Sequence, residues 1–182
     1  MNNLIITRDM DPMDPRKEFD NLGTMVCWHR RYSLGDIQPK ESPDDWRRDN
    51  LPPGSLELPL YLYDHSGITM NTVGFSRCDS ARWDWGQIGF IFCPVEKVLA
   101  EYGEEILTHC ITEKAIQVME SEVRIYDQYL QGEVWGYQHS SNDPEDSCWG
   151  FYGSTLEETG ILEHLPADLD RKLIERAWEA RS

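Results

Sequence analysis

The chain has 182 residues, which is enough for one hydrophobic core and short for two, so we expect a single domain over residues 1–182. Its 33 acidic side chains outnumber its 17 lysines and arginines, and the formal net charge is -16. Such a charge repels the phosphates of nucleic acids and of anionic membranes, and it favours encounters with basic protein surfaces. We therefore expect neither direct nucleic-acid binding nor membrane association.

The negative charge is concentrated in the second half of the chain. Residues 1–93 carry 14 acidic and 10 basic side chains, whereas residues 94–182 carry 19 acidic and 7 basic side chains. A solvated acidic surface that only keeps the protein soluble is one explanation, and a docking surface for a basic partner is the other. The sequence leaves both open.

Nothing in the chain resembles a targeting segment. The start has neither the basic stretch nor the apolar core of a secretory signal, and no apolar run approaches membrane-spanning length. The cysteines are scattered and form no Cys-x-x-Cys pair, which indicates reduced thiols. We therefore expect a cytoplasmic protein.

In the first half of the chain, strand-like segments are separated by proline and glycine. The two Asp-Pro steps at residues 11–12 and 14–15 favour turns after a short apolar run. Pro59 indicates that the strand that contains it lies at the edge of a sheet or begins late. The expected elements are strands over 23–32, 56–63, 68–75 and 83–92, and a polar surface loop over 39–53.

Helices and a hairpin are expected in the second half. A helix over 95–102 begins after Pro94 and ends at Gly103, and a long helix over 112–131 has Thr112 as its N-cap and Gly132 as its end. Two aromatic strands over 133–140 and 147–153 form a hairpin, and the chain ends in a helix over 166–180. The expected fold is therefore α+β, with a mixed or antiparallel sheet of about six short strands packed against the long helix and the C-terminal helix.

The long helix has two apolar stripes, which predicts that it packs on two sides. One stripe runs from Ala115 to Leu130, and the second contains Val118, Ile125 and Tyr129. Glu122 lies between the stripes, so its carboxylate is either paired in a gap between packing surfaces or at an edge that reaches water. We expect the edge position.

Carboxylates follow the opposite face of this helix and continue into the hairpin. If they share one side of the fold, they are spaced like phosphates and fit a groove built for DNA or RNA. These candidate partner-binding residues are Glu113, Glu120 and Asp127 on the helix, Asp143, Glu145 and Asp146 at the hairpin tip, and Glu157 and Glu158 after it.

A second candidate site combines two histidines with two carboxylates. His29, Asp64, His65 and Asp84 come from separate strand ends, and such a set can bind a metal ion or serve as an acid-base pair if it converges in space. The alternative is that these side chains are hydrogen-bonded residues of strand ends, which we favour. We therefore assign no metal, no cofactor and no catalytic residue.

Known catalytic motifs are absent from the sequence. It has no glycine-rich phosphate loop, no Gly-x-Ser-x-Gly elbow and no His-Glu-x-x-His pair. Cys27 and Cys148 each lie beside a tryptophan in an expected strand, where an apolar setting raises the thiol pKa and weakens the nucleophile. The motifs therefore favour a binding protein over an enzyme.

Several strings between Asp20 and Gly153 resemble a family of small accessory proteins of phages and other bacterial mobile elements. They are DNLGTMVCWHRRYSLGD, YDHSGITMNT, WDWGQIGF, RIYDQYLQGEVWGY and DSCWGFYG. Length and acidity also resemble those of inhibitors of type II-A CRISPR nucleases. This resemblance implies an anti-CRISPR protein that covers the DNA-contacting surface of a guide-loaded nuclease, and it supplies no catalytic residues.

The leading hypothesis is thus a non-enzymatic inhibitor of a host defence nuclease. A CRISPR nuclease is the first candidate partner, a restriction enzyme the second, and a homodimer is compatible with the sequence. The rival hypotheses are a small metal-dependent enzyme or ligand-binding domain that uses the histidine and aspartate set, and a structural component of a phage or plasmid.

Overall fold

The computed structural model describes residues 3–78, 83–140 and 146–181. The fold is α+β, as predicted, with seven strands in two antiparallel sheets and five α-helices in the described residues. In this part of the chain, no helix is both long enough and apolar enough to cross a membrane.

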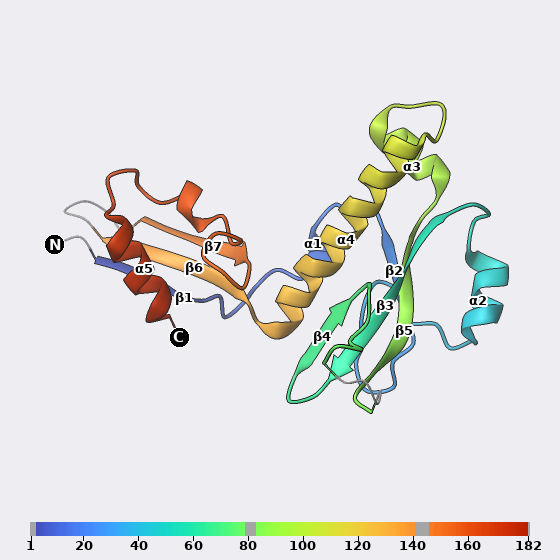
Figure 1. The fold of residues 1–182 in the computed structure, drawn as a ribbon, viewed down its shortest axis with the longest axis horizontal. Coiled ribbons are helices and arrows are strands. Elements are labelled where there is room, and N and C mark those ends of the chain that lie inside the picture. The colour runs from blue at the N-terminus through green and yellow to red at the C-terminus, as the bar shows by residue number, and fades with distance from the viewer. Residues whose placement is uncertain (1–2, 79–82, 141–145, 182) are drawn as a thin grey trace. The chain divides into compact units, whose positions relative to one another are not determined.

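The chain divides into two compact units, each with its own sheet (Figure 1). Unit 1 comprises Met1–Asp14 and Gln128–Ser182, and unit 2 comprises Pro15–Asp127. The single domain over residues 1–182 stays a prediction, because two compact units can still unfold as one cooperative body.

Unit 2 is built on a four-stranded antiparallel sheet in the order β2-β5-β3-β4. The strands are β2 (Thr24–Cys27), β3 (Leu56–Asp64), β4 (Ile68–Asn71) and β5 (Trp85–Cys93). β5 has a neighbour on each side and is buried from Gly89 onward, as its apolar run predicted. β3 lies between β5 and β4 and begins at Leu56, so the expectation of an edge strand or a late start is wrong. Pro59 is accommodated because β4 pairs only with residues 61–64 of β3.

The first predicted strand is shorter than the expected range 23–32. β2 ends at Cys27, and one more backbone bond joins Trp28 to β5. The imidazole Nδ1 of His29 then accepts the backbone N–H groups of Arg31 and Tyr32. This side chain stabilises a turn in which the strand cannot continue.

The predicted surface loop over 39–53 is wrong, because it contains helix α2 (Pro43–Asn50). The hydroxyl of Ser42 accepts the N–H of Asp45 and caps the first turn, in which Pro43 is tolerated. Trp46 is buried against the aromatic rings of Trp28, Phe90 and Phe92, at centroid distances of 5.8 to 6.2 Å. Trp46 is thus the buried contact of α2 with the sheet, and Arg47 adds a contact over the Phe90 ring and an ion pair with Glu57 of β3.

Helix α3 and the start of helix α4 lie at one end of unit 2, and α4 runs from there across the unit (Figure 1). Helix α3 (Val95–Tyr102) has the predicted bounds, and Gly103 ends it in the left-handed region with φ 65°. Helix α4 (His109–Gln131) begins before the predicted Thr112, because the hydroxyl of Thr108 accepts the N–H of Ile111 and serves as the cap. Gly132 ends it as predicted, with φ 69°.

Helix α4 buries its first apolar stripe fully and its second only in part. The first apolar stripe is confirmed, since its inward members are buried, namely Ala115, Met119, Val123 and Tyr126. The second stripe is only partly covered: Val118 is 39% exposed, and Ile125 is partly buried and lines a pocket together with the segment that follows α1. The second predicted packing surface is thus looser than the first.

The guanidinium group of Arg16, in helix α1 (Pro15–Glu18), is the centre of a polar network in unit 2 and is 3% exposed. Its Nε and Nη2 atoms donate to the two carboxylate oxygens of Asp36, at 3.0 and 2.5 Å. Nη1 donates to Asn21 Oδ1 at 3.0 Å and to Glu122 Oε2 at 3.2 Å. Nη2 also donates to the carbonyl of Gly23 at 2.7 Å. These bonds occupy all the N–H donors that an arginine has.

Glu122 is a paired carboxylate, so the expected edge position is wrong. Its side chain is 10% exposed, and besides Arg16 it binds the backbone N–H groups of Leu22 at 2.5 Å and Gly23 at 3.1 Å. Burial acts to lower the pKa of Arg16, but hydrogen bonding and charge from Asp36 and then Glu122 raise it overall. The string from Asp20 to Asp36 is therefore largely a structural motif.

Unit 1 is built on a three-stranded antiparallel sheet in the order β1-β6-β7. The strands are β1 (Asn3–Arg8), β6 (Val134–Ser140) and β7 (Asp146–Tyr152). The predicted hairpin of β6 and β7 is confirmed, while its tip with Asp143 and Glu145 lies outside the described residues.

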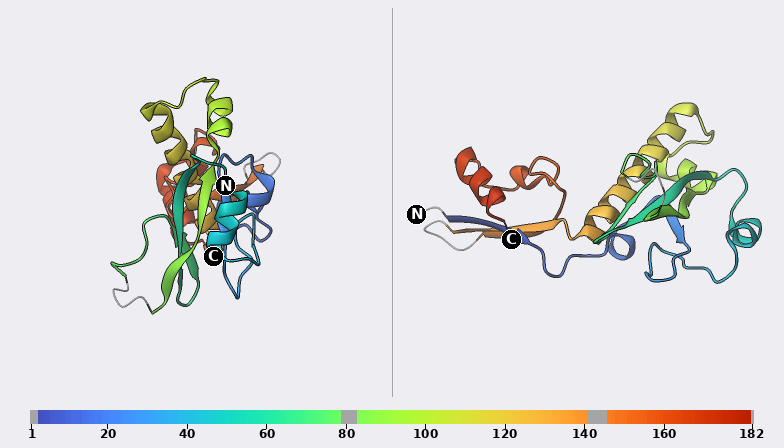
Figure 2. Two further views of the ribbon diagram at one scale, coloured as in Figure 1. Left: turned by 90° about the vertical axis from the view of Figure 1, so that its right-hand side faces the viewer. Right: turned by 60° about the horizontal axis from the view of Figure 1, so that its bottom comes forward.

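One face of this sheet is covered by the 3-10 helix η1 (Ile161–Glu163) and by helix α5 (Arg171–Glu179) (Figure 2). The core between them buries Leu4, Ile6, Trp135, Tyr137, Phe151, Leu156, Ile161, Leu165 and Ile174. The predicted C-terminal helix begins at Arg171 rather than Pro166, because the carboxylate of Asp170 caps it by accepting the N–H of Lys172.

Candidate functional site

The predicted carboxylates of α4 do not form one solvent-facing strip. Glu113 and Glu120 are exposed, and Glu113 lies 3.2 Å from the imidazole of His109. Asp127 instead accepts hydrogen bonds from Thr69 Oγ1 at 2.8 Å and from the N–H of Met70 at 2.7 Å. Asp127 therefore attaches α4 to β4 and is a structural residue.

The remaining predicted carboxylates belong to unit 1. Asp146 is exposed at the start of β7, and Glu157 is 2.7 Å from Arg171. A hydrogen bond to its own backbone and then its pairing with Arg171 lower the pKa of Glu157. The carboxylate of Glu158 accepts the N–H and the hydroxyl of Ser154 at 3.0 and 2.8 Å. These three are thus on a different unit from the helix carboxylates.

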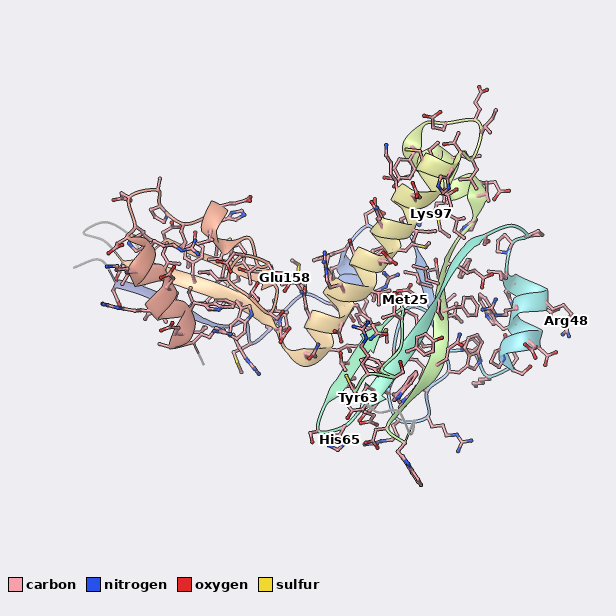
Figure 3. All side chains as sticks on the ribbon, in the orientation of Figure 1. Met25, Arg48, Tyr63, His65, Lys97 and Glu158 are labelled. Carbon is pink, nitrogen blue, oxygen red and sulfur yellow. The ribbon has the colours of Figure 1, made fainter. Side chains whose placement is uncertain are left out.

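An acidic surface that the prediction missed lies at the end of unit 2 where α3 meets α4. Four glutamates of α3 and of the connection to α4 are exposed, namely Glu96, Glu101, Glu104 and Glu105. Together with Glu113 and Glu120 of the first half of α4, they make up what we call the acidic end, six exposed glutamates within residues 96–120. Figure 3 marks its location by Lys97 on α3.

The glutamates of the acidic end are in contact with water. In the described part of the chain, none of its six glutamates forms an ion pair with a lysine or an arginine. Residues 96–120 contain only two basic side chains, Lys97 and Lys114. The sequence pattern that indicates this acidic surface is the run Glu-Tyr-Gly-Glu-Glu at residues 101–105. Part of it lies outside the helices, so helix periodicity alone does not identify it.

The histidine and aspartate set gathers only in part. At the end of β3, His65 Nδ1 lies 3.0 Å from Asp84 Oδ2 (Figure 3 labels His65), and Asp64 pairs with Arg31 at 2.9 Å. His29 uses its Nδ1 as an acceptor for its own turn and stacks on a tyrosine ring. Among the described residues, no group of three histidine, cysteine or acidic side chains is placed to hold a metal ion.

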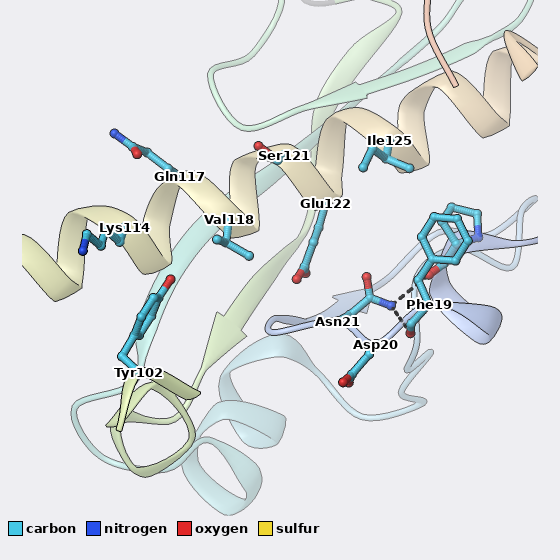
Figure 4. Close-up of a pocket in the computed structure, with 11 residues that line it drawn as sticks. Phe19, Asp20, Asn21, Tyr102, Lys114, Gln117, Val118, Ser121, Glu122 and Ile125 are labelled. Atoms are coloured by element: carbon cyan, nitrogen blue, oxygen red, sulfur yellow. Dashed lines mark hydrogen bonds between the residues drawn. The ribbon is translucent and has the colours of Figure 1, made fainter. Parts of the chain in front are cut away.

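A pocket of about 480 Å³ lies in unit 2 between α4 and the segment that follows α1 (Figure 4). Its apolar wall includes Phe19, Tyr102, Val118 and Ile125. Glu122 points into the same region, but Arg16 and backbone N–H groups already bind both of its oxygens. The pocket therefore has room for a ligand, but the carboxylate of Glu122 is not available for acid-base chemistry because both of its oxygens are already bonded.

The buried thiol of Cys27 is not a nucleophile at neutral pH. Burial and then the charge of Asp36 raise its pKa to about 12, while the charge of Arg16 acts in the opposite direction. A thiol with this pKa stays protonated, as the apolar setting of Cys27 predicted. Comparison of the chain with models of protein families, with curated proteins and with solved structures finds no match.

Proposed function

We propose that this protein is a non-enzymatic inhibitor that binds the basic, DNA-contacting surface of a bacterial defence nuclease. The guide-loaded type II-A CRISPR nuclease is the first candidate partner, and a restriction enzyme is the second. The observation that carries the proposal is the acidic end of unit 2, where six exposed glutamates lie on α3, on the connection to α4 and on the first half of α4.

The acidic end suits a basic surface because its charges are spread and accessible. Carboxylates several ångströms apart along a helix pair present separated negative charges, as a phosphate backbone does. Charges of one sign on a surface also raise the association rate with a partner of opposite sign. Glu113 and Glu120 remain in the proposed surface, whereas Asp127 leaves it because β4 already binds its carboxylate.

The proposal is tested by DNA cleavage with a guide-loaded type II-A nuclease in the presence of excess protein. We expect strong inhibition at about 50 mM salt and weaker inhibition at about 300 mM, because the Debye length falls over this range. Addition of target DNA before the protein should protect the nuclease. Full cleavage at low salt would contradict the proposal. So would inhibition that is the same at both salt concentrations and does not depend on the order of addition.

A further inference from the structure

The segment from Asp9 to Met13 is held against the sheet of unit 1 at both of its ends. The N–H of Asp9 donates to the carbonyl of Val134 at 2.8 Å, and the hydroxyl of Tyr152 donates to the carbonyl of Met13. Burial and then the charge of Asp9 raise the pKa of Tyr152 to about 12, so this hydroxyl remains a donor at neutral pH. The segment is therefore fixed in position.

Two methionines of this fixed segment are exposed to solvent. Met10 is 89% exposed and Met13 is 54% exposed. Asp9 and Asp11 alternate with them, and the carboxylate of Asp9 accepts the N–H of Asp11 at 3.1 Å, which defines the turn. Flexible thioether side chains on a surface adapt their shape to what binds them.

Trp149 forms the wall beside the methionines and is 44% exposed. It lies opposite Gly136 in the register of β6 and β7, on the sheet face away from the buried core. A Cβ atom added at Gly136 would lie 2.0 Å from the indole ring, so the ring rests on the glycine backbone. The indole ring of Trp149 is thus held in place by the sheet and has part of its surface open to solvent.

These residues enclose an open groove of about 490 Å³, lined by Asp9, Met10, Asp11, Met13, Trp149 and Gly150. Its walls are apolar and aromatic, and its only ionisable lining residues are the two aspartates. An arginine side chain matches both features, because its methylene stem packs on apolar surface and its guanidinium group binds carboxylates and aromatic faces.

We infer that this groove binds an arginine side chain of the basic protein partner. The inference rests on the proposed function for the identity of that partner and adds a contact that the acidic end does not supply. The guanidinium group binds Asp9 and Asp11 beside the face of Trp149, and the stem lies against Met10 and Met13.

The inference is tested by NMR on the full chain with ¹³C-labelled methionine methyl groups. The probe is an acetylated, unstructured Gly-Ser peptide that carries two arginines, and its control is the same peptide with citrulline, the neutral isostere of arginine. We expect the methyl signals of Met10 and Met13 to shift saturably with the arginine peptide and at least about fivefold less with citrulline, because the charge contributes about 1 kcal/mol.

The matched variants are Asp9→Asn with Asp11→Asn, and a control pair on the same unit, Glu163→Gln with Asp168→Asn. Asparagine at position 9 can still accept the N–H that forms the turn, so the segment should keep its shape. The first pair should abolish the shifts and the control pair should keep them. Equal shifts with citrulline, or shifts that survive in the first pair, would overturn the inference. No nuclease is present, so this result is separate from that of the cleavage test.

Discussion

Replacement of Arg16 by methionine is expected to lower the free energy of unfolding of unit 2 by about 3–5 kcal/mol. Methionine keeps an unbranched apolar stem but leaves the carboxylates of Asp36 and Glu122 facing each other in a poorly solvated site. It also leaves the carbonyl of Gly23 without its donor. Chemical denaturation followed by circular dichroism measures the loss.

The control is Arg48→Met, which removes an arginine whose side chain is exposed and pairs with Asp45 and Asp49. Exposed pairs contribute about 0–1 kcal/mol, so this variant should be nearly as stable as the parent. A similar small loss for Arg16→Met would show that the buried network contributes no more than a surface pair.

Replacement of Trp46 by alanine should also lower the free energy of unfolding by about 3–5 kcal/mol. Trp46 is the one buried residue of α2, and its ring packs on Phe90 and Phe92 of β5. Without it, α2 has no buried residue of its own, and its remaining contacts with the sheet are partly exposed, such as Arg47 over the Phe90 ring. Eight residues make a marginal helix alone. Hydrogen exchange should therefore show loss of protection first in α2.

The control for this variant is Asp49→Ala, an exposed position on the same helix whose change should alter stability by less than about 0.5 kcal/mol. If α2 keeps its protection when Trp46 is replaced, another contact holds the helix on the sheet and our description of its packing is wrong.

The sequence predicted the elements best where proline and glycine mark their ends. The bounds of α3 and the end of α4 follow from Pro94, Gly103 and Gly132, because these residues act on the backbone within a few positions. Helix α2 was missed because its surroundings are polar and rich in proline. Its start signal at Ser42 was present, but its single buried residue gives no periodic pattern.

Contacts between distant residues were beyond the reach of sequence patterns. The helical wheel identified Glu122 as unusual, yet its partner Arg16 lies 106 positions away, and no local rule connects them. The same holds for Asp127, whose wheel position indicated solvent although β4 lies there to bind it. The role of a carboxylate on a helix depends on its tertiary contacts, which a helical-wheel projection of the sequence does not include.

The sequence predicted an acidic docking surface, but only two of the residues predicted for it belong to the surface that we now propose. Charge counts identified the second half of the chain as acidic, and Glu113 and Glu120 remain in the proposed surface. The acid-rich connection between α3 and α4 was not predicted, because the expected surface was built from carboxylates of the long helix and the hairpin.

The most direct test of the account is the affinity of two charge-matched variants for the guide-loaded type II-A nuclease. One carries Glu101→Gln, Glu104→Gln and Glu105→Gln in the acidic end. The other carries the same number of neutralised carboxylates at exposed positions of unit 1, with Glu163→Gln, Asp168→Asn and Glu179→Gln.

Both variants have the same net charge, so any difference between them reports the location of the charge. At low salt we expect the Kd of the acidic-end variant to rise about tenfold, because three contacts of about 0.5 kcal/mol each are removed. The control variant should stay within about twofold of the parent. Equal weakening of the two variants, or no weakening of the first, would contradict a docking role for the acidic end.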